Sequence, residues 1–240
     1  MPNQTVILTW KTGGDFHFTD VNLLAYHIHK QYRGDDPLIV YCLTDTVKQE
    51  LKLKYVTLLP AKNPQWNGWW IKMNLFDPEM EKYRPFLYMD LDTAVVNPLV
   101  DILPPKGQED KFICLSSFFT PPRANELQSG MMWFAKNNKQ IFAIWNEWIK
   151  NPNANIFKFH RNGGDQSFFR SVITMCEKDW QSFIHNRIWS FKINPTNTKM
   201  DWLKDLPNHL SVVCFHGTPR IPVAAKTIPW VSEYVKEVYK

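Results

Sequence analysis

Phe86-Leu87-Tyr88-Met89-Asp90-Leu91-Asp92 is the stretch that decides the fold of this 240-residue chain. Four apolar residues follow Pro85 and run directly into two aspartates, which predicts a buried strand with carboxylates where it leaves its sheet. Ligands of open α/β sheets bind at the carboxyl ends of the strands. Two oxygen donors there suit Mg²⁺ or Mn²⁺, which proteins hold with one or two carboxylates plus substrate phosphates. On spacing alone, an acidic turn that caps the next element is the alternative.

Strand-like and helix-like patterns alternate on both sides of this stretch. Before it, we predict strands at 6–9, 38–43 and 56–59, a helix from an N-cap at Asp20 to Tyr32, and a Trp-rich helix over 66–76. After it, we predict strands at 112–115, 131–134 and 211–215, the last of them beside the main sheet, and helices near 140–149 and 166–176. This order predicts one α/β domain over residues 1–240, with a mostly parallel central sheet and a less regular C-terminal half.

The composition excludes several classes of protein. Hydrophobic residues make up 44% of the chain, including 11 Trp and 16 Phe, which is ample for a packed core. The net charge of +5 is dispersed without a long Lys/Arg run, which argues against a nucleic-acid partner but fits an anionic small ligand. We expect neither a membrane segment nor a signal peptide, because the chain shows no long apolar window and no charged-then-apolar leader. Four scattered cysteines without a CxxC pair suggest reduced thiols in a cytoplasmic protein.

Five motifs stand in an order known from one group of enzymes. They are Trp69–Met73, Asp90–Asp92, Gln128–Met132, Gly164–Gln166 and Phe215–Pro222. Together they resemble the nucleotide-sugar glycosyltransferases of the GT-A fold, in particular the family of glycogenin and the bacterial lipopolysaccharide galactosyltransferases (family 8). The resemblance covers about residues 5 to 225 and implies a Rossmann-like GT-A domain.

The resemblance also implies a function. It implies metal-dependent transfer of a sugar from a nucleotide-diphosphate donor, a UDP-sugar, to a glycan or other hydroxyl acceptor, with retention of the anomeric configuration and Mn²⁺ or Mg²⁺ as cofactor. The implied metal ligands are Asp90, Asp92 and His216, and the implied catalytic residues are Asp165 and Gln166. The implied donor-binding residues are Thr9, Trp10, Lys11, Lys72, Asp90, Leu91, Asp92, Ser129, Gly130, Gly217 and Arg220.

The C-terminal motif departs from the family pattern. When Gly217 is aligned with the family glycine, Cys214 stands at the position of the metal-binding histidine, and His216 follows two residues later. Strand side chains alternate with period two, so His216 points the same way and could still reach the metal. Arg220 replaces the family lysine. Thr9-Trp10-Lys11 also lacks the Asp or Asn pair that reads uracil in the family, which leaves the donor base open.

Several residues have a second reading. Asp165 could simply N-cap its helix or could face the transferred sugar, and Lys72 and Arg220 could bind phosphate or be solvated surface charges. We expect Trp66, Trp69 and Trp70 to be core residues rather than a sugar-stacking face, since they stand at helical spacing. We expect the long, irregular segment 177–210 to form the wall of the site that contacts the acceptor.

Two other functions compete with sugar transfer. A phosphatase of the DxDx(T/V) type requires Thr or Val four residues after the first Asp, but Ala94 stands there. A non-catalytic module that binds nucleotide sugars or glycans on the same fold is the second, because a fold does not fix a function.

Overall fold

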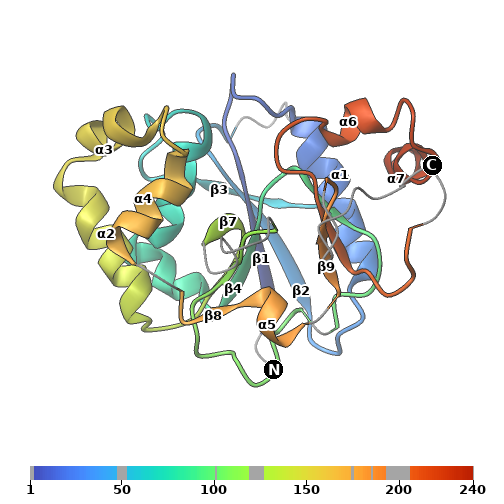
Figure 1. The fold of residues 1–240 in the computed structure, drawn as a ribbon, viewed down its shortest axis with the longest axis horizontal. Coiled ribbons are helices and arrows are strands. Elements are labelled where there is room, and N and C mark those ends of the chain that lie inside the picture. Colours follow the sequence, from blue (N-terminus) through green and yellow to red (C-terminus); the bar gives the residue numbers. More distant parts are fainter. Residues whose placement is uncertain are drawn as a thin grey trace.

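The strands in the described part of the chain form two sheets. The computed structural model describes residues 3–47, 53–100, 102–118, 127–173, 176–184, 186–192 and 206–239. A seven-stranded sheet has the order β3-β2-β1-β4-β7-β6-β8, and a three-stranded sheet has the order β5-β10-β9 (Figure 1). The larger sheet separates α1 on one face from α2, α3 and α4 on the other.

The first four strands of the central sheet are parallel, as the sequence predicts. They are β1 (Gln4–Trp10), β2 (Leu38–Thr44), β3 (Thr57–Pro60) and β4 (Phe86–Met89). The side chains of Val6 and Leu8 pack on the α1 side, whereas Ile7 packs on the opposite side. Both faces of β1 are therefore buried, which explains its continuous apolar run.

The antiparallel neighbour of β4 builds one edge of the site. It is β7 (Gln128–Phe134), followed outward by β6 (Ile113–Leu115) and β8 (Lys178–Asp179). Met89 pairs with Met131, so the carboxyl end of β4 lies beside the amino end of β7. The Asp90 N–H donates to the Gly130 carbonyl at 2.8 Å. Two motifs far apart in the sequence, Asp90–Asp92 and Gln128–Met132, are thereby joined.

Helix α1 (Phe18–Gln31) begins earlier than predicted. His17 is the N-cap, and Asp20 occupies the third helical position, where its carboxylate accepts a 2.7 Å hydrogen bond from the His17 N–H. This is a capping box, so the prediction of Asp20 as the N-cap is wrong by three residues. The apolar stripe of Val21, Leu24 and Ile28 is buried against the central sheet, as its spacing indicates.

The opposite face of the sheet carries the Trp-rich segment and three helices. The segment forms 3₁₀-helices, η1 (Gly68–Phe76) and η2 (Pro78–Tyr83), rather than an α-helix. The helices are α2 (Lys139–Lys150), α3 (Pro152–Phe159) and α4 (Gly164–Val172). Helix α3 was not predicted, and α4 both begins and ends earlier than the predicted range.

The small sheet corrects the expected position of the last strand. β10 (Val212–Cys214) does not join the main sheet but lies between β5 (Thr93–Val95) and β9 (Ile188–Ser190). Cys214 pairs with Thr93, directly after Asp92. This pairing brings the C-terminal motif to the aspartates.

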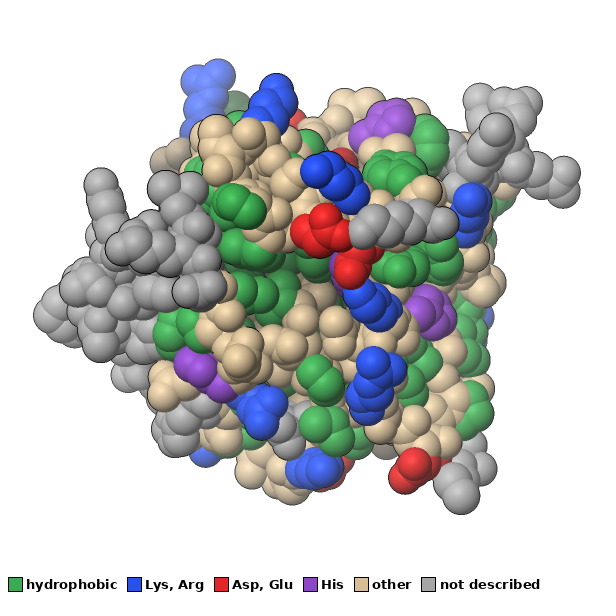
Figure 2. Space-filling model, turned by 90° about the vertical axis from the view of Figure 1, so that its right-hand side faces the viewer, with side chains coloured by type: hydrophobic (Ala, Val, Ile, Leu, Met, Phe, Trp, Pro, Cys, Tyr) green, Lys and Arg blue, Asp and Glu red, His purple; other side chains and the backbone are tan. Residues whose placement is uncertain are grey.

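Three helices complete the chain: α5 (Trp180–Phe183), α6 (Ile221–Ala224) and α7 (Pro229–Glu237). Helices α6 and α7 cover the small sheet. On the face shown in Figure 2, Lys/Arg and Asp/Glu side chains are interspersed among apolar and polar surface. Within the described ranges, no helix is both long and apolar enough to cross a bilayer.

Candidate functional site

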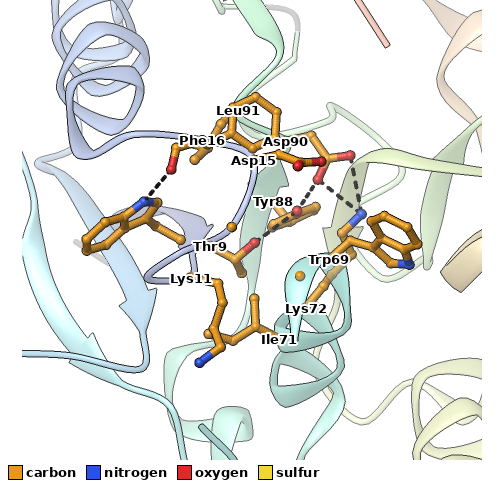
Figure 3. A pocket seen from close by; sticks show the side chains of 13 residues that line it. Thr9, Lys11, Asp15, Phe16, Trp69, Ile71, Lys72, Tyr88, Asp90 and Leu91 are labelled. Carbon is orange, nitrogen blue, oxygen red and sulfur yellow. Dashed lines mark hydrogen bonds and ion pairs between the residues drawn. The ribbon is translucent and has the colours of Figure 1, made fainter. Parts of the chain in front are cut away.

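A cleft opens at the carboxyl ends of β1 and β4. It encloses about 490 Å³ of free space, which includes the open mouth of the cleft. Its lining includes these predicted donor-binding residues: Thr9, Trp10, Lys11, Lys72, Asp90 and Leu91. Figure 3 shows the polar side chains of β1, η1 and β4 meeting in this cleft. The cleft therefore lies where the apolar run ending in Asp90 predicted a ligand site.

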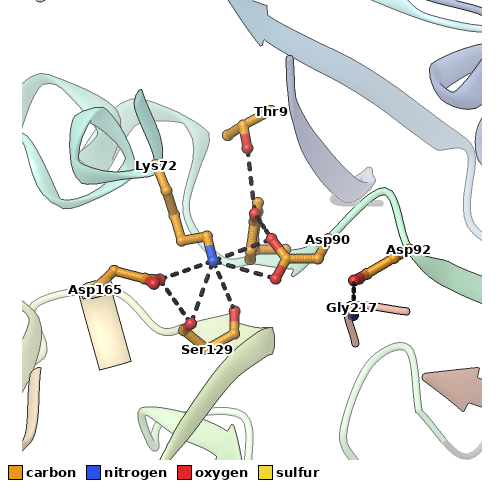
Figure 4. Close-up of polar contacts among 8 residues, drawn as sticks. Thr9, Lys72, Asp90, Asp92, Ser129, Asp165 and Gly217 are labelled. Carbon is orange, nitrogen blue, oxygen red and sulfur yellow. Dashed lines mark hydrogen bonds and ion pairs between the residues drawn. The ribbon is translucent and has the colours of Figure 1, made fainter. Parts of the chain in front are cut away.

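Lys72 is the centre of a buried polar network in the cleft. Its side chain is 3% exposed, and its Nζ lies 3.0 Å from Asp90 Oδ1 and 2.9 Å from Asp165 Oδ2. Nζ also donates to Ser129 Oγ at 3.2 Å, and Ser129 Oγ donates to Asp165 Oδ2 at 2.6 Å (Figure 4). Lys72 is therefore not a solvated surface charge, since it joins residues of η1, β4, β7 and α4.

Asp165 does not cap its helix. The N-cap of α4 is Gly163, which has a φ of 85° and makes no side-chain cap hydrogen bond. Asp165 lies in the first turn, 7% exposed, and its carboxylate faces Lys72 and Ser129. Of the two readings of Asp165, the simple N-cap is therefore wrong. Its contact with Lys72, which lines the cleft, is compatible with a role toward substrate.

Tyr88 belongs to the same network and was not singled out in the sequence. Its hydroxyl donates to Asp90 Oδ1 and lies 3.2 Å from Thr9 Oγ1. The signal was present, because residues 88 and 90 are two apart and side chains of a strand point the same way at that interval. Tyr88 thus connects the end of β1 with the carboxylate of Asp90.

The two aspartates lie on a tight turn and face different partners. The Thr93 N–H donates to the Asp90 carbonyl at 3.1 Å, which closes the turn. Asp92 Oδ2 accepts a 3.2 Å hydrogen bond from the Gly217 N–H. Gly217 has a φ of 91°, a left-handed conformation suited to glycine, and the turn aims its N–H at Asp92. Asp92 and Gly217, two of the implied donor-binding residues, are thus in contact.

Burial dominates the electrostatics of the network. Desolvation raises the pKa of Asp90 to about 6, with Lys72 acting in the opposite direction and Asp92 adding to the rise. Desolvation also raises the pKa of Asp92, against the Gly217 N–H. For Lys72, desolvation lowers the pKa, but Asp165 and Asp90 outweigh it, so the pKa is raised well above its usual range. Negative charge in this cleft is therefore costly without a cation nearby.

Asp90 and Asp92 fit a divalent cation as two oxygen donors whose mutual repulsion a cation would relieve. A complete cage of side chains is not preformed, because no group of three His, Cys, Asp or Glu suited to a metal occurs among the described residues. In the arrangement described, substrate phosphate and water would have to supply the remaining ligands unless His216 moves toward the aspartates. The metal role of both aspartates stays a prediction.

His216 lies beside this turn, but other groups contact its ring. Its Nε2 is 2.7 Å from Ser190 Oγ, and the ring stacks on Phe118 at 5.5 Å. Burial and the charge of Lys192 lower the pKa of His216 to about 4, so the imidazole is neutral at neutral pH. A neutral imidazole is the ligand form, but Asp90, Asp92 and His216 are not gathered as a three-residue metal group. Metal ligation by His216 stays a prediction.

The basic groups near the C-terminal motif have protein partners. Arg220 donates to the Asp15 carbonyl at 2.7 Å and to Asp15 Oδ2 at 3.0 Å, and its guanidinium lies 4.3 Å from the centre of the Phe16 ring. Lys192, which the sequence did not reveal as a site residue, donates from Nζ to the His216 carbonyl at 2.9 Å. Arg220 therefore joins the C-terminal motif to the loop after β1.

Two further predicted residues, Gln166 and Lys11, have partners outside the Lys72 network. Gln166 Oε1 accepts a 3.5 Å hydrogen bond from Arg170, which also binds the Leu127 carbonyl. Lys11 lines the cleft, but its Nζ pairs with Asp45 at 2.6 Å. Part of the expected acceptor wall, 193–205, lies outside the described residues.

Comparisons with known proteins bear on the fold. No family model matches the chain, and a search of curated proteins finds no match. Among solved structures, the galactosyltransferase LgtC, in complex with donor and acceptor sugar analogues, has a TM-score of 0.64 at 10% identity and covers 98% of this chain and 95% of its own. The fold is the GT-A fold of glycosyltransferases.

Two further solved structures share this fold. The bifunctional glycosyltransferase WbbM has a TM-score of 0.57 at 10% identity, covering 99% of this chain and 52% of its own. The glycosyltransferase GlyE of Streptococcus pneumoniae TIGR4 has a TM-score of 0.56 at 14% identity, and the match covers 98% of this chain and 63% of GlyE. A second structure of LgtC, with a TM-score of 0.59, is an active-site mutant in which glutamine is replaced by glutamate. The predicted GT-A fold is thereby confirmed.

Proposed function

We propose that this protein transfers a sugar from a nucleoside-diphosphate sugar to a hydroxyl acceptor, with a divalent cation held by Asp90 and Asp92. The observation that carries the proposal is the turn bearing both carboxylates at the end of β4, beside a cleft lined by polar residues of β1 and η1. The likeness to LgtC, which binds donor and acceptor sugar analogues, supports the same use of the cleft. A UDP-sugar is the proposed donor, and retention the proposed outcome, because the sequence resembles the glycogenin family.

The residues of the cleft divide this work between them. A bound Mn²⁺ or Mg²⁺ would neutralise the negative charge that develops on the departing diphosphate. Lys72 holds the Asp90 and Asp165 carboxylates in fixed positions through its ion pairs. Asp165 then presents a preorganised negative charge, which can stabilise positive charge at the reacting sugar carbon. Arg220 would exchange Asp15 for phosphate oxygens, for which its planar fork is well suited.

Gln166 is the second proposed catalytic residue. It follows Asp165 in the first turn of α4, and its amide would have to leave Arg170 to reach the substrate. The glutamine named in the active-site mutant of LgtC gives this proposal its support. His216 is the proposed third metal ligand, and it would have to leave the hydroxyl of Ser190 to bind the cation.

The test is donor turnover with a matched pair of variants. The purified protein is incubated with a panel of UDP- and GDP-sugars, with Mn²⁺, with Mg²⁺ and with EDTA, and release of the nucleoside diphosphate is measured. We expect metal-dependent release, a loss of at least about a hundredfold in Asp92→Asn, and wild-type rates in Asp110→Asn, whose side chain is 75% exposed. The anomer of the product reports retention.

Donor affinity separates a metal ligand from a structural residue. Asp92→Asn should weaken nucleotide-sugar binding in Mn²⁺ but leave the weaker binding in EDTA unchanged. An equal loss in both conditions would make Asp92 a structural residue of its turn. Release from none of the nucleotide sugars would overturn the proposed transferase and favour a module that only binds them.

A further inference from the structure

Trp69 differs from its neighbours in the Trp-rich segment. Trp66 and Trp70 are 3% and 1% exposed, and Trp70 stacks on Trp148 at 5.2 Å, so both are core residues as predicted. Trp69 is 40% exposed and lines the cleft. The prediction of a core position is therefore wrong for Trp69, and its place in the cleft needs another reason.

The indole of Trp69 is held in a fixed orientation from behind. It stacks on His160 with ring centres 4.9 Å apart and planes only 11° apart. Its Nε1 edge lies against Gly164, where a Cβ would stand 2.9 Å from Nε1. Gly164 has a φ of 62°, which favours glycine and leaves room for this close approach. Trp69 is therefore packed against the residue that directly precedes Asp165.

The surroundings of Trp69 combine an apolar ring with charged and hydroxyl groups. Lys72 is three residues further along η1 and joins Asp165 to Ser129. A pyranose ring has the matching chemistry, since its axial C–H groups form an apolar face and its hydroxyls bind carboxylates and amines. An alkyl chain would use only the apolar ring.

We propose that Trp69 is a stacking platform for the pyranose ring of a substrate, backed by His160 and positioned by Gly164. The inference rests on the proposed sugar transfer and deepens it, because it makes Trp69 a residue that selects substrates with an open apolar sugar face. A rigid aromatic surface is effective here because little conformational freedom is lost on binding. The ring is that of the acceptor or of the donor sugar, and the two require different measurements.

Direct binding of simple glycosides tests the platform without turnover. Saturation-transfer NMR is recorded with methyl β-galactoside, methyl β-glucoside, methyl α-mannoside and methyl N-acetyl-β-glucosaminide. We expect at least one to bind through ring protons of a single face, with affinity roughly three- to tenfold lower in Trp69→Leu and largely kept in Trp69→Phe. Phe157→Leu, at a 91% exposed aromatic on α3, is the matched control and should bind as wild type.

Kinetics separates the two sources of the ring. A rise in the donor KM for hydrolysis in Trp69→Leu assigns the platform to the donor sugar, whereas a rise only in the acceptor KM assigns it to the acceptor. Gly164→Ala should raise the same KM more than Trp69→Leu does, since the Cβ of the alanine would displace the indole. Thermal melting of each variant excludes a loss of folding as the cause.

The outcomes distinguish this inference from the proposed function. If Trp69→Leu binds the glycosides as well as wild type, or if wild type binds none of the four, the platform is overturned whatever the turnover. If glycoside binding depends on Trp69 but no nucleotide sugar is turned over, the platform stands as a sugar-binding site and the proposed transferase fails.

Discussion

The two sides of the cleft hold their charged groups in opposite ways. On the side of β4, β7 and α4, Lys72 is 3% exposed and bonded to two carboxylates and a hydroxyl. On the C-terminal side, Arg220 has a side chain that is 32% exposed and pairs with Asp15, which is 66% exposed. The first side is a closed network, and the second is a contact between two surface loops.

This difference indicates different roles. A buried ion pair costs desolvation but fixes the geometry of its groups, and breaking it leaves an unpaired charge. A surface pair contributes little to stability and can exchange its partner for a ligand without much cost. We infer that the Lys72 side positions the reacting groups, whereas the Arg220 side responds to the arriving diphosphate.

The largest expected effect comes from removing the centre of the closed network. Lys72→Met leaves Asp90 and Asp165 buried without their cation, so we expect about 3–5 kcal/mol lower unfolding free energy and no measurable turnover. Denaturant unfolding and donor hydrolysis measure the two effects. Ser129→Ala is the graded control, since it removes one hydroxyl and should cost only about 1 kcal/mol.

A second control tests whether the positive charge at residue 72 is what stabilises the network. Lys72→Arg keeps the positive charge but brings a wider head group, and it should keep more stability than Lys72→Met. Equal stability in Lys72→Met and wild type would mean that protonation of the two aspartates compensates for the lost amine. In that case the network would not be held together by charge.

The closed side was largely predictable from the sequence. The apolar run 86–89 predicts a strand and places Asp90 at its end, and period-two alternation could have added Tyr88. The contact of Lys72 with Asp165 was not predictable, because it depends on how η1 and α4 pack on the same face of the sheet. Local patterns fix an element and its faces, but not which residues of two packed elements meet.

The C-terminal side was less predictable. The run 211–215 predicts a strand, but the pairing of Cys214 with Thr93 joins segments more than a hundred residues apart. Short strands such as β5 and β9, with three residues each, carry little periodic signal. The donor-binding roles of Asp92 and Gly217 came from the family resemblance, and the structure shows a hydrogen bond between the two residues.

A smaller effect is expected at Arg220. Arg220→Ala should raise the donor KM about tenfold, because one bidentate contact with phosphate is lost, while the melting temperature stays near wild type. Asp15→Asn weakens the competing pair and should leave the donor KM equal or lower. Lys150→Ala, at an exposed lysine that pairs with Glu147, controls for the loss of one positive charge.

A comparison of Arg220→Ala with Asp15→Asn tests whether Arg220 exchanges Asp15 for phosphate. If Asp15→Asn raises the donor KM as much as Arg220→Ala does, the two residues act together to hold the loop in place. Arg220 would then be structural on this side of the cleft, and the contrast between a closed and an adjustable side would disappear.

The smallest effect is expected where the C-terminal side is anchored to the core. Helix α7 packs on α1 through His27, which is 2% exposed, stacks on Tyr234 at 3.6 Å and has its Nε2 2.8 Å from the Tyr234 carbonyl. Glu237 lies 3.8 Å from Nδ1 and also pairs with Lys30, and Tyr26 contacts the ring edge-on. Burial lowers the pKa of His27, although the Tyr234 carbonyl and Glu237 oppose the shift.

The direction of the pKa shift sets the direction of the pH effect. Above about pH 6.5 the imidazole is neutral in both the folded and the unfolded chain, so it adds no pH dependence there. As the pH falls below that value, the unfolded chain takes up the proton first, and the folded protein loses stability until His27 is protonated as well.

The melting temperature of wild type should therefore fall more between about pH 7.5 and about pH 5.5 than that of His27→Phe, which keeps a ring against Tyr234. His209→Phe, at an exposed histidine, controls for the loss of one imidazole and should fall as wild type does. If His27→Phe falls as steeply as wild type, the pH response arises elsewhere, and the anchor of α7 is insensitive to protonation of this histidine.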